Sequence, residues 1–324
     1  MMKKVLVWIS LSVIFGVLVL ILIDALLMAG FRKTTEDVPG KMNVIFNDSS
    51  YFDILCLGSS RALAHFDTDM ISKKTGLSVY NAGVNGGGVL SMKIILEGYL
   101  KKHRPPKLLL VQLDEFTFET SHIMELPYYM PLLPDFDFDQ TIVDAAPELY
   151  WISKFPPARV FYYDDLQKWI GVKSFLGLGN TAHVGTNGFS NHSYAGWNEY
   201  WESEYQKRMP LIRAPFDSSF AFEKGLFILN SILRTAQDHG VSVMLTSSPI
   251  PGGAFYPKYD AAVNSAMESV EDKYTNLVFY WRHQIELDRK SYYYDLVHLV
   301  RRGASEYSEA VSDTICKSYP VICK

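Results

Sequence analysis

The segment LCLGSSRA, Leu55–Ala62, decides the fold class of this chain. The apolar residues Ile54–Leu57 predict a short buried strand, the glycine and two serines a tight turn, and the residues after them a helix. Three later apolar runs have the same character: Lys107–Leu113, Val241–Thr246 and Leu277–Tyr280. Runs of this kind, without polar alternation, are typical of a parallel sheet that is covered by helices on both faces.

Helical patterns fill the intervals between these strands. We expect a helix from the first strand to about Thr75, a short strand at Ser78–Tyr80, and helices at Val89–Lys102, Phe222–His239, Tyr259–Tyr274 and Gly303–Lys317. The alternation predicts an α/β domain, and ligands of such domains bind at the carboxyl ends of the strands.

The stretch from Thr117 to Ala221 breaks this alternation. It is rich in proline, aromatic residues, glycine and asparagine. A structureless loop of that length inside a compact domain would be unusual. We therefore interpret about 117–221 as an insertion over the sheet, whose aromatic side chains either pack it onto the core or line a substrate groove.

The amino-acid composition excludes several classes of protein. The chain has 324 residues, of which 48% are hydrophobic and 20% charged, which is ample for a large core. Its formal net charge is −4 and it has no long basic run, so we expect no nucleic-acid partner. Three cysteines are too few for a disulfide framework.

The N-terminus predicts a membrane anchor. Lys3 and Lys4 precede a 19-residue apolar run, Val5–Ile23, which as a helix is about 28 Å long and matches the hydrocarbon core of a bilayer. We interpret residues 1–33 as an uncleaved signal anchor rather than a cleaved signal peptide, with the N-terminus inside. Asp24 lies either at the outer interface or against a membrane partner.

The rest of the chain, residues 34–324, carries 27 basic and 34 acidic residues and is expected to be extracytoplasmic, in the periplasm or at the cell surface. Cys316 and Cys323 fit a small terminal disulfide in such a compartment, whereas Cys56 lies in an apolar run and fits a buried thiol.

Three polar segments follow predicted strands. Ser60 lies at a strand-to-helix turn, where a serine is exposed beside the amides of a helix N-terminus, and it acts either as a nucleophile or as an ordinary helix cap. Gly86–Gly88 open the next helix and provide either amide donors for a ligand or a tight turn. Asp295 and His298 are three residues apart in YYYDLVHL. In a short loop such a carboxylate can hold the Nδ1 proton of the imidazole and leave Nε2 as a base.

Together, these segments resemble the SGNH (GDSL-type) hydrolase superfamily over about residues 50–118 and 241–317. The resemblance implies a flavodoxin-like three-layer fold, a nucleophile at Ser60, an oxyanion glycine at Gly86 and an Asp-x-x-His block at Asp295 and His298. The third family block, Gly-x-Asn-Asp, is LDEF here, with Phe116 near the place of the asparagine donor. We therefore assign the oxyanion hole to the amides of Ser60 and Gly86, with Asn85 as a substitute donor.

The anchor and the GSS serine block look most similar to the envelope-modifying members of that superfamily, such as the D-alanine transfer protein and the partners of polysaccharide O-acetyltransfer. The resemblance implies a serine esterase or acyltransferase that acts on acyl esters of an envelope polysaccharide or on a small ester. It also implies a membrane-bound O-acyltransferase as partner. The alternative is an inactive glycan-binding scaffold with the same fold. We expect no cofactor, and no metal site at His183 or His192, which lack metal-ligand spacing.

Overall fold

The computed structural model describes residues 2–35, 37–46, 50–114, 117–118, 129, 140–145, 147–178, 187–190, 196–212, 220–251, 264, 267–268, 270, 273–275, 277–280 and 290–323. The chain divides into two units, one of residues 1–48 and 125–183 and one of residues 49–124 and 184–324. Residues 125–183 of the first unit lie within the insertion expected at about 117–221.

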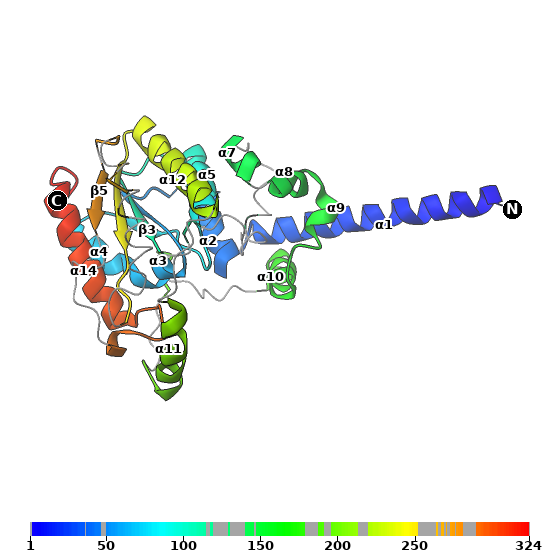
Figure 1. Ribbon diagram of the computed structural model, residues 1–324. Helices are drawn as coiled ribbons and strands as arrows, with labels where there is room; N and C mark the ends of the chain where they lie inside the picture. The colour runs from blue at the N-terminus through cyan, green and yellow to red at the C-terminus, as the bar shows by residue number, and fades with distance from the viewer. Residues whose placement is uncertain are drawn as a thin grey trace. The chain divides into compact units, whose positions relative to one another are not determined.

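The second unit is built on a five-stranded sheet (Figure 1). Its strands are β1 (Ile54–Leu57), β2 (Val79–Asn81), β3 (Leu108–Leu113), β4 (Ser242–Ser247) and β5 (Leu277–Tyr280). Every neighbouring pair is parallel, and the order is β2-β1-β3-β4-β5. This is the order of doubly wound, flavodoxin-like sheets, in which the direction of winding reverses between β1 and β3. The expected α/β class with a parallel sheet is confirmed.

Helices cover the sheet and match most of the expected ones. Within its described residues, the helices of this unit are α3 (Ser60–His65), α4 (Thr68–Thr75), α5 (Val89–Lys102), α11 (Glu199–Ile212), α12 (Phe220–Asp238) and α14 (Arg301–Ser318), with the 3₁₀ helix η3 (Lys290–Tyr292). Helix α14 packs with α3 and α4, while α12 packs with α5. The helix expected at Tyr259–Tyr274 lies mostly outside the described residues.

The first expected helix is wrong in one respect, because it is two helices. The break falls at Phe66 and Asp67, where the Asp67 side chain accepts a hydrogen bond from the amide of Met70 and caps α4. The side chain of Asn81 donates to the carbonyl of Phe66 at 3.1 Å and satisfies the end of α3. The hydrogen bond from Asn81 therefore ends α3, and the cap by Asp67 begins α4.

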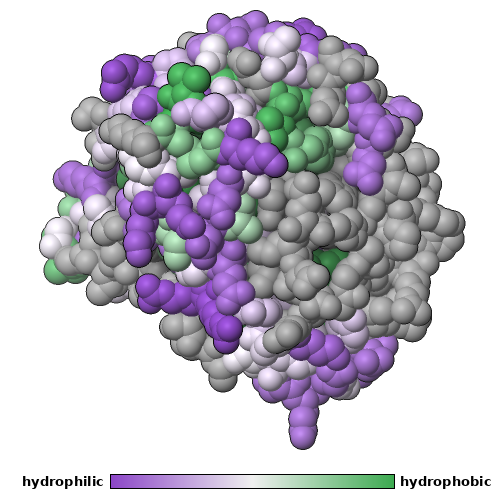
Figure 2. All heavy atoms as spheres, turned by 90° about the vertical axis from the view of Figure 1, so that its left-hand side faces the viewer, coloured by the Kyte–Doolittle hydropathy of each residue, from purple (hydrophilic) through white to green (hydrophobic). Residues whose placement is uncertain are grey.

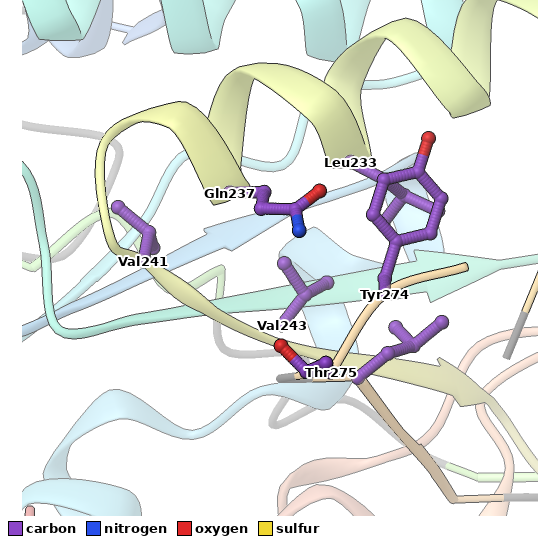
Figure 3. A pocket seen from close by; sticks show the side chains of 7 residues that line it. Leu233, Gln237, Val241, Val243, Tyr274 and Thr275 are labelled. Atoms are coloured by element: carbon purple, nitrogen blue, oxygen red, sulfur yellow. The ribbon is translucent and has the colours of Figure 1, made fainter. Parts of the chain in front are cut away.

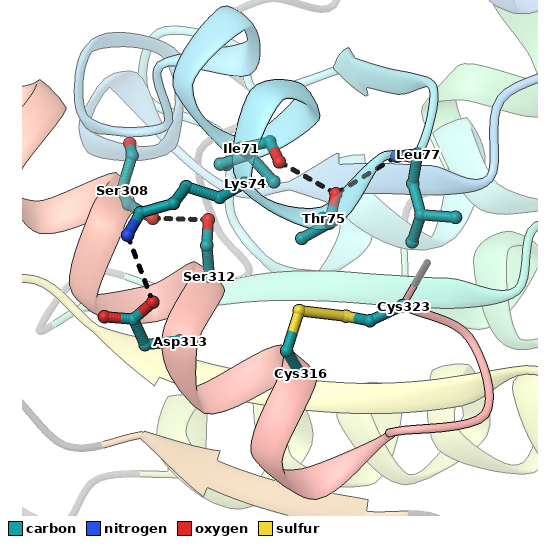
Figure 4. The surroundings of a disulfide bond; sticks show 9 residues. All are labelled: Ile71, Lys74, Thr75, Leu77, Ser308, Ser312, Asp313, Cys316 and Cys323. Atoms are coloured by element: carbon teal, nitrogen blue, oxygen red, sulfur yellow. Dashed lines mark hydrogen bonds and ion pairs between the residues drawn. A yellow bond between two sulfur atoms is a disulfide. The ribbon is translucent and has the colours of Figure 1, made fainter.

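The C-terminus is closed by a disulfide between Cys316 and Cys323, as the sequence predicts (Figure 4). The bond ties the last turn of α14 to the tail, and the hydroxyl of Tyr319 donates to the carbonyl of Val243 at 2.7 Å. Cys56 is buried and forms no disulfide, also as predicted. Around α14, the side of the molecule seen in Figure 2 carries many hydrophilic side chains, with hydrophobic ones in small groups between them.

The first unit contains the long N-terminal helix α1 (Met2–Phe31), which by length and composition could cross a membrane (Figure 1). Its other helices are α2 (Asp37–Phe46), α7 (Gln140–Ala145), α8 (Pro147–Lys154), α9 (Pro156–Arg159) and α10 (Asp165–Phe175). The last turns of α1 pack on α9 and α10. Asp24 is buried there, and both Nε (3.0 Å) and Nη2 of Arg159 bind its carboxylate. Its partner is therefore an arginine of the same chain.

Candidate active site

The turn after β1 presents Ser60 at the carboxyl edge of the sheet. Gly58 has φ +153°, and a Cβ there would lie 2.6 Å from the Cβ of Ala62 and 2.7 Å from that of Gln112, so only glycine fits. Ser59 is the N-cap of α3, its hydroxyl accepting a hydrogen bond from the Arg61 amide at 3.2 Å. Ser60 is therefore the first residue of the helix and is half-buried.

A buried carboxylate joins this turn to the neighbouring strand. Asp114 follows β3, and the hydroxyl of Ser59 donates to its Oδ2. Its backbone amide in turn binds the hydroxyl of Thr117 at 2.7 Å. The pair spans β1 and β3, where ligands of doubly wound sheets bind. Asp114 was not among the predicted site residues, although its place after an apolar strand was a signal for it.

Asp295 shapes the loop that carries His298. Its Oδ1 accepts the amides of Val297 (2.9 Å) and His298 (2.8 Å), while its Oδ2 lies 2.8 Å from His298 Nδ1. Burial acts to raise the pKa of Asp295, but the hydrogen bond and charge of His298, together with the two amides, hold that pKa below its ordinary value. An ionised Asp295 that accepts the Nδ1 proton leaves Nε2 of a neutral imidazole unprotonated.

The structure brings the three predicted residues into one hydrogen-bonded line. His298 Nε2 lies 2.8 Å from Ser60 Oγ, although the two residues are 238 positions apart. The side chains of His298 and Asp295 are 20% and 15% exposed, so the line is accessible but largely desolvated. This is the geometry in which an imidazole can take a proton from a hydroxyl.

Gly86 and Asn85 lie on the loop between β2 and α5. The amide of Val84 donates to the carbonyl of Gly58 at 3.1 Å, which attaches this loop to the turn that carries Ser60. The Gly87 amide donates to the Val84 carbonyl at 3.0 Å, and Gly86 has φ +64°, as the third residue of a type II turn requires. Gly86 and Asn85 are exposed. Their role as oxyanion donors stays a prediction.

A second, fully buried histidine is hydrogen-bonded to the loop that carries His298. His65 Nε2 accepts the amide of Leu299 at 3.0 Å, so the ring of neutral His65 carries its proton on Nδ1, which lies 2.7 Å from Ser248 Oγ. Ser248 donates to Gln112 Oε1 at 2.7 Å. This chain of hydrogen bonds runs from Gln112 on β3 to Leu299, the residue after His298. It was not predicted, because its members are up to 234 positions apart in the sequence.

Aromatic residues of the expected insertion lie beside the loop that carries His298. Tyr205 and Ile250 form a small core against which Trp197 and Leu296 pack. The Lys290 Nζ lies 4.6 Å from the centre of the Tyr205 ring and 2.6 Å from a carboxylate oxygen of Glu202. The bonds from Lys290, Gln206 and Trp197 lower the pKa of Glu202 to about 2. Trp197 and Tyr205 therefore serve the packing role that the sequence left open.

A small pocket lies at the opposite edge of the sheet. It is lined by residues at the starts of β4 and β5 and by α12, among them Leu233, Gln237 and Val243 (Figure 3). Because Ser60 lies at the carboxyl ends of the strands, this pocket is not part of the candidate site. Among the described residues, no group of three or more His, Cys, Asp or Glu side chains could hold a metal. Phe116, His183 and His192 lie outside the described residues.

Comparison of the chain with family models finds no match, and comparison with curated proteins finds no significant match. The site is therefore judged on its geometry alone.

Proposed function

We propose that this chain is a membrane-anchored serine esterase or acyltransferase of the SGNH type. In this proposal it acts outside the cytoplasm on acyl esters of an envelope glycan. The observation that carries the proposal is the hydrogen-bonded line from Ser60 through His298 to Asp295, with both distances at 2.8 Å. Its position at the carboxyl edge of a doubly wound sheet and the order of the three residues along the chain support the superfamily.

Acylation begins at the Ser60 hydroxyl. As Ser60 Oγ attacks the ester carbonyl, its proton passes to His298 Nε2, and Asp295 stabilises the imidazolium through Nδ1. The amides of Ser60 and Gly86, with Asn85, hold the oxyanion of the tetrahedral intermediate. The intermediate collapses when the bond to the leaving alkoxide breaks and His298 returns the proton to that oxygen. The products are an acyl-serine and a free alcohol.

Deacylation runs the same steps with a new hydroxyl. His298 takes a proton from water or from a glycan hydroxyl, whose oxygen attacks the acyl carbonyl and restores Ser60. Water releases the free acid, and a glycan hydroxyl receives the acyl group. A membrane-bound O-acyltransferase is the class of partner that would present an acyl donor at this surface.

The proposed location rests on α1 and on the C-terminal disulfide. A 30-residue helix with an uncharged run after Lys3 and Lys4 suits an anchor. The bond between Cys316 and Cys323 suits an oxidising compartment. A reporter enzyme fused after Lys324 tests this location: activity of a periplasmic reporter supports it, and activity of a cytoplasmic reporter contradicts it.

A fluorophosphonate probe tests the chemistry without knowledge of the substrate. We expect wild type to be labelled, Ser60→Ala to be unlabelled, and Asp295→Asn to be labelled at least tenfold more slowly. Ser291→Ala is the matched control, because Ser291 is an exposed serine near the same loop, and it should label like wild type. A wild-type chain that is correctly folded but not labelled would contradict the enzyme and leave the glycan-binding scaffold.

A further inference from the structure

Helix α1 packs closely against α9 and α10. A Cβ added to Gly30 would lie 1.8 Å from the carbonyl oxygen of Gly171, so the two backbones touch where the helices cross. Six residues earlier, Asp24 is bound by Arg159, and the hydroxyl of Tyr163 lies 3.4 Å from the same carboxylate. The contacts involve only the last third of α1.

The length of α1 places this contact at the membrane surface. At 1.5 Å per residue its 30 residues extend about 45 Å, whereas the hydrocarbon core of a bilayer is about 30 Å thick. Residues 5–19 are all exposed, and burial within the unit becomes regular only from Asp24 onward. If the apolar run spans the core, the turns from Asp24 to Phe31 lie in the headgroup layer, and α9 and α10 lie there with them.

The helices around this contact expose apolar side chains. Trp151, Phe155, Phe161, Leu166, Trp169 and Phe175 are all exposed, with Phe161 at 74% and Trp151 at 69%. They come from α8, from α10 and from the links beside α9.

The pattern of α10 departs from that of a water-soluble surface helix. Its buried residues are Gln167, Ile170, Gly171 and Ser174, whereas Leu166 and Trp169 are exposed together with Asp165. A surface helix in water buries its large apolar residues and exposes its polar ones. The small buried residues let α10 approach α1 closely. The large exposed apolar residues suit a surface that contacts a less polar medium than water.

We propose that α8, α9 and α10 form a collar that lies in the interfacial layer of the bilayer crossed by α1. Its ligand is lipid: Trp151, Phe161 and Trp169 insert at the boundary between headgroups and acyl chains. The collar continues the surface of the spanning helix, and amphipathic aromatic rings are enriched at this depth. Lys168 and Lys173, half-buried on α10, have the long aliphatic chains that extend to headgroups. The proposal rests on the anchor proposed above.

Site-specific fluorescence tests the collar in the full chain. Because Cys56 is buried and the other two cysteines are bonded, a single introduced cysteine can be labelled with the environment-sensitive dye NBD. The chain is reconstituted in phosphatidylcholine vesicles that contain lipid with a nitroxide at carbon 5 or carbon 12 of the acyl chain. The collar positions are Phe161→Cys and Trp169→Cys, the spanning position is Leu11→Cys, and the baseline is Asp313→Cys on the exposed side of α14.

We expect both collar labels to be quenched at least twofold above the baseline, and more by the carbon-5 than by the carbon-12 nitroxide. The Leu11 label should be quenched more by the carbon-12 nitroxide. A quenched Leu11 label with both collar labels at the baseline overturns the collar and leaves the anchor intact. All labels at the baseline overturn the anchor and the collar together.

A protein partner on the same surface gives a different result. In that case the collar labels stay at the baseline in pure lipid vesicles but are shielded from aqueous iodide in native membranes. That outcome also overturns the lipid collar.

Discussion

Replacement of His65 should weaken both the fold and the reaction, because this residue holds the backbone next to the proposed base. In His65→Leu the buried amide of Leu299 loses the acceptor that lies 3.0 Å away, and Ser248 loses a partner at 2.7 Å. An unsatisfied buried N–H costs about 1–3 kcal/mol, and the lost hydrogen bond of Ser248 about 1 kcal/mol more. We therefore expect the free energy of unfolding to fall by about 2–4 kcal/mol.

The effect on the reaction follows from the position of Leu299. It directly follows His298, whose Nε2 must stay near Ser60 Oγ. Displacing a catalytic group by about 1 Å can cost about 10²-fold in rate. The second-order rate constant for fluorophosphonate labelling should fall by about that factor in His65→Leu.

Two amide variants separate positioning from general stability. The Oε1 of glutamine stands as many bonds from Cβ as Nε2 of histidine, so His65→Gln keeps an acceptor for the Leu299 amide and loses the contact with Ser248. His65→Asn does the reverse. We expect His65→Gln to label within about threefold of wild type and His65→Asn to label as slowly as His65→Leu.

Urea unfolding of the detergent-purified chain, paired with labelling kinetics, measures both effects. Ser248→Ala is the matched control: it leaves the bond between His65 and Leu299 intact, and it should cost about 1 kcal/mol with little change in labelling rate. Equal labelling rates for His65→Gln and His65→Asn, or a wild-type rate in His65→Leu, would refute the reasoning.

Three further predictions concern other parts of the chain. Arg159→Met leaves the Asp24 carboxylate buried and unpaired, so the unfolding free energy should fall by about 3–5 kcal/mol; Asp24→Asn added to that variant should restore part of it, and no recovery would contradict the pairing. The folded-state pKa of Asp295 is below its ordinary 3.8, so its stabilisation is complete above that pH and is lost as pH falls through the lower folded value; the difference in urea midpoint between wild type and Asp295→Asn should be full at about pH 5 and shrink below about pH 4. The family resemblance puts Phe116 at the place of the asparagine donor, where an apolar ring is expected to exclude water from the acyl-serine, so in Phe116→Asn ester hydrolysis relative to transfer to a glycan should rise about tenfold or more, measured as the ratio of free acid to acylated glycan; an unchanged ratio would contradict it.

The sheet was predictable because its strands are local apolar runs. Leu277–Tyr280 is a strand with the expected bounds, and Ser78–Tyr80 differs from β2 by one residue. Val89–Lys102 is likewise a helix as expected, because Gly88 before it and the basic residues at its end mark its limits. The break between α3 and α4 was missed because the side chain that binds the carbonyl at the end of α3 belongs to Asn81 of another element, β2, and a single sequence does not show that contact.

The site was predictable in part for the same reason. Ser60, Asp295 and His298 lie in short motifs after strands, so the topology alone brings them to one edge. His65 and Asp114 act through partners on other elements, and a single sequence does not show such pairs. Helix α10 was missed because its apolar residues lie on both sides, Ile170 buried and Leu166 and Trp169 exposed, which removes the periodic pattern by which helices are recognised.

The separation between Ser60 and His298 also determines when the site can exist during biosynthesis. The two residues are 238 positions apart, and β4 pairs with β3 across more than 120 residues of chain. Contacts of such long range form late, because the intervening chain must first be synthesised and its loop closed. A nascent chain that ends between Ser60 and His298 has the proposed nucleophile but not the proposed base. In the proposed reaction the site is therefore inert until the segment after β5 has been synthesised, and every fragment that ends before His298 is inactive.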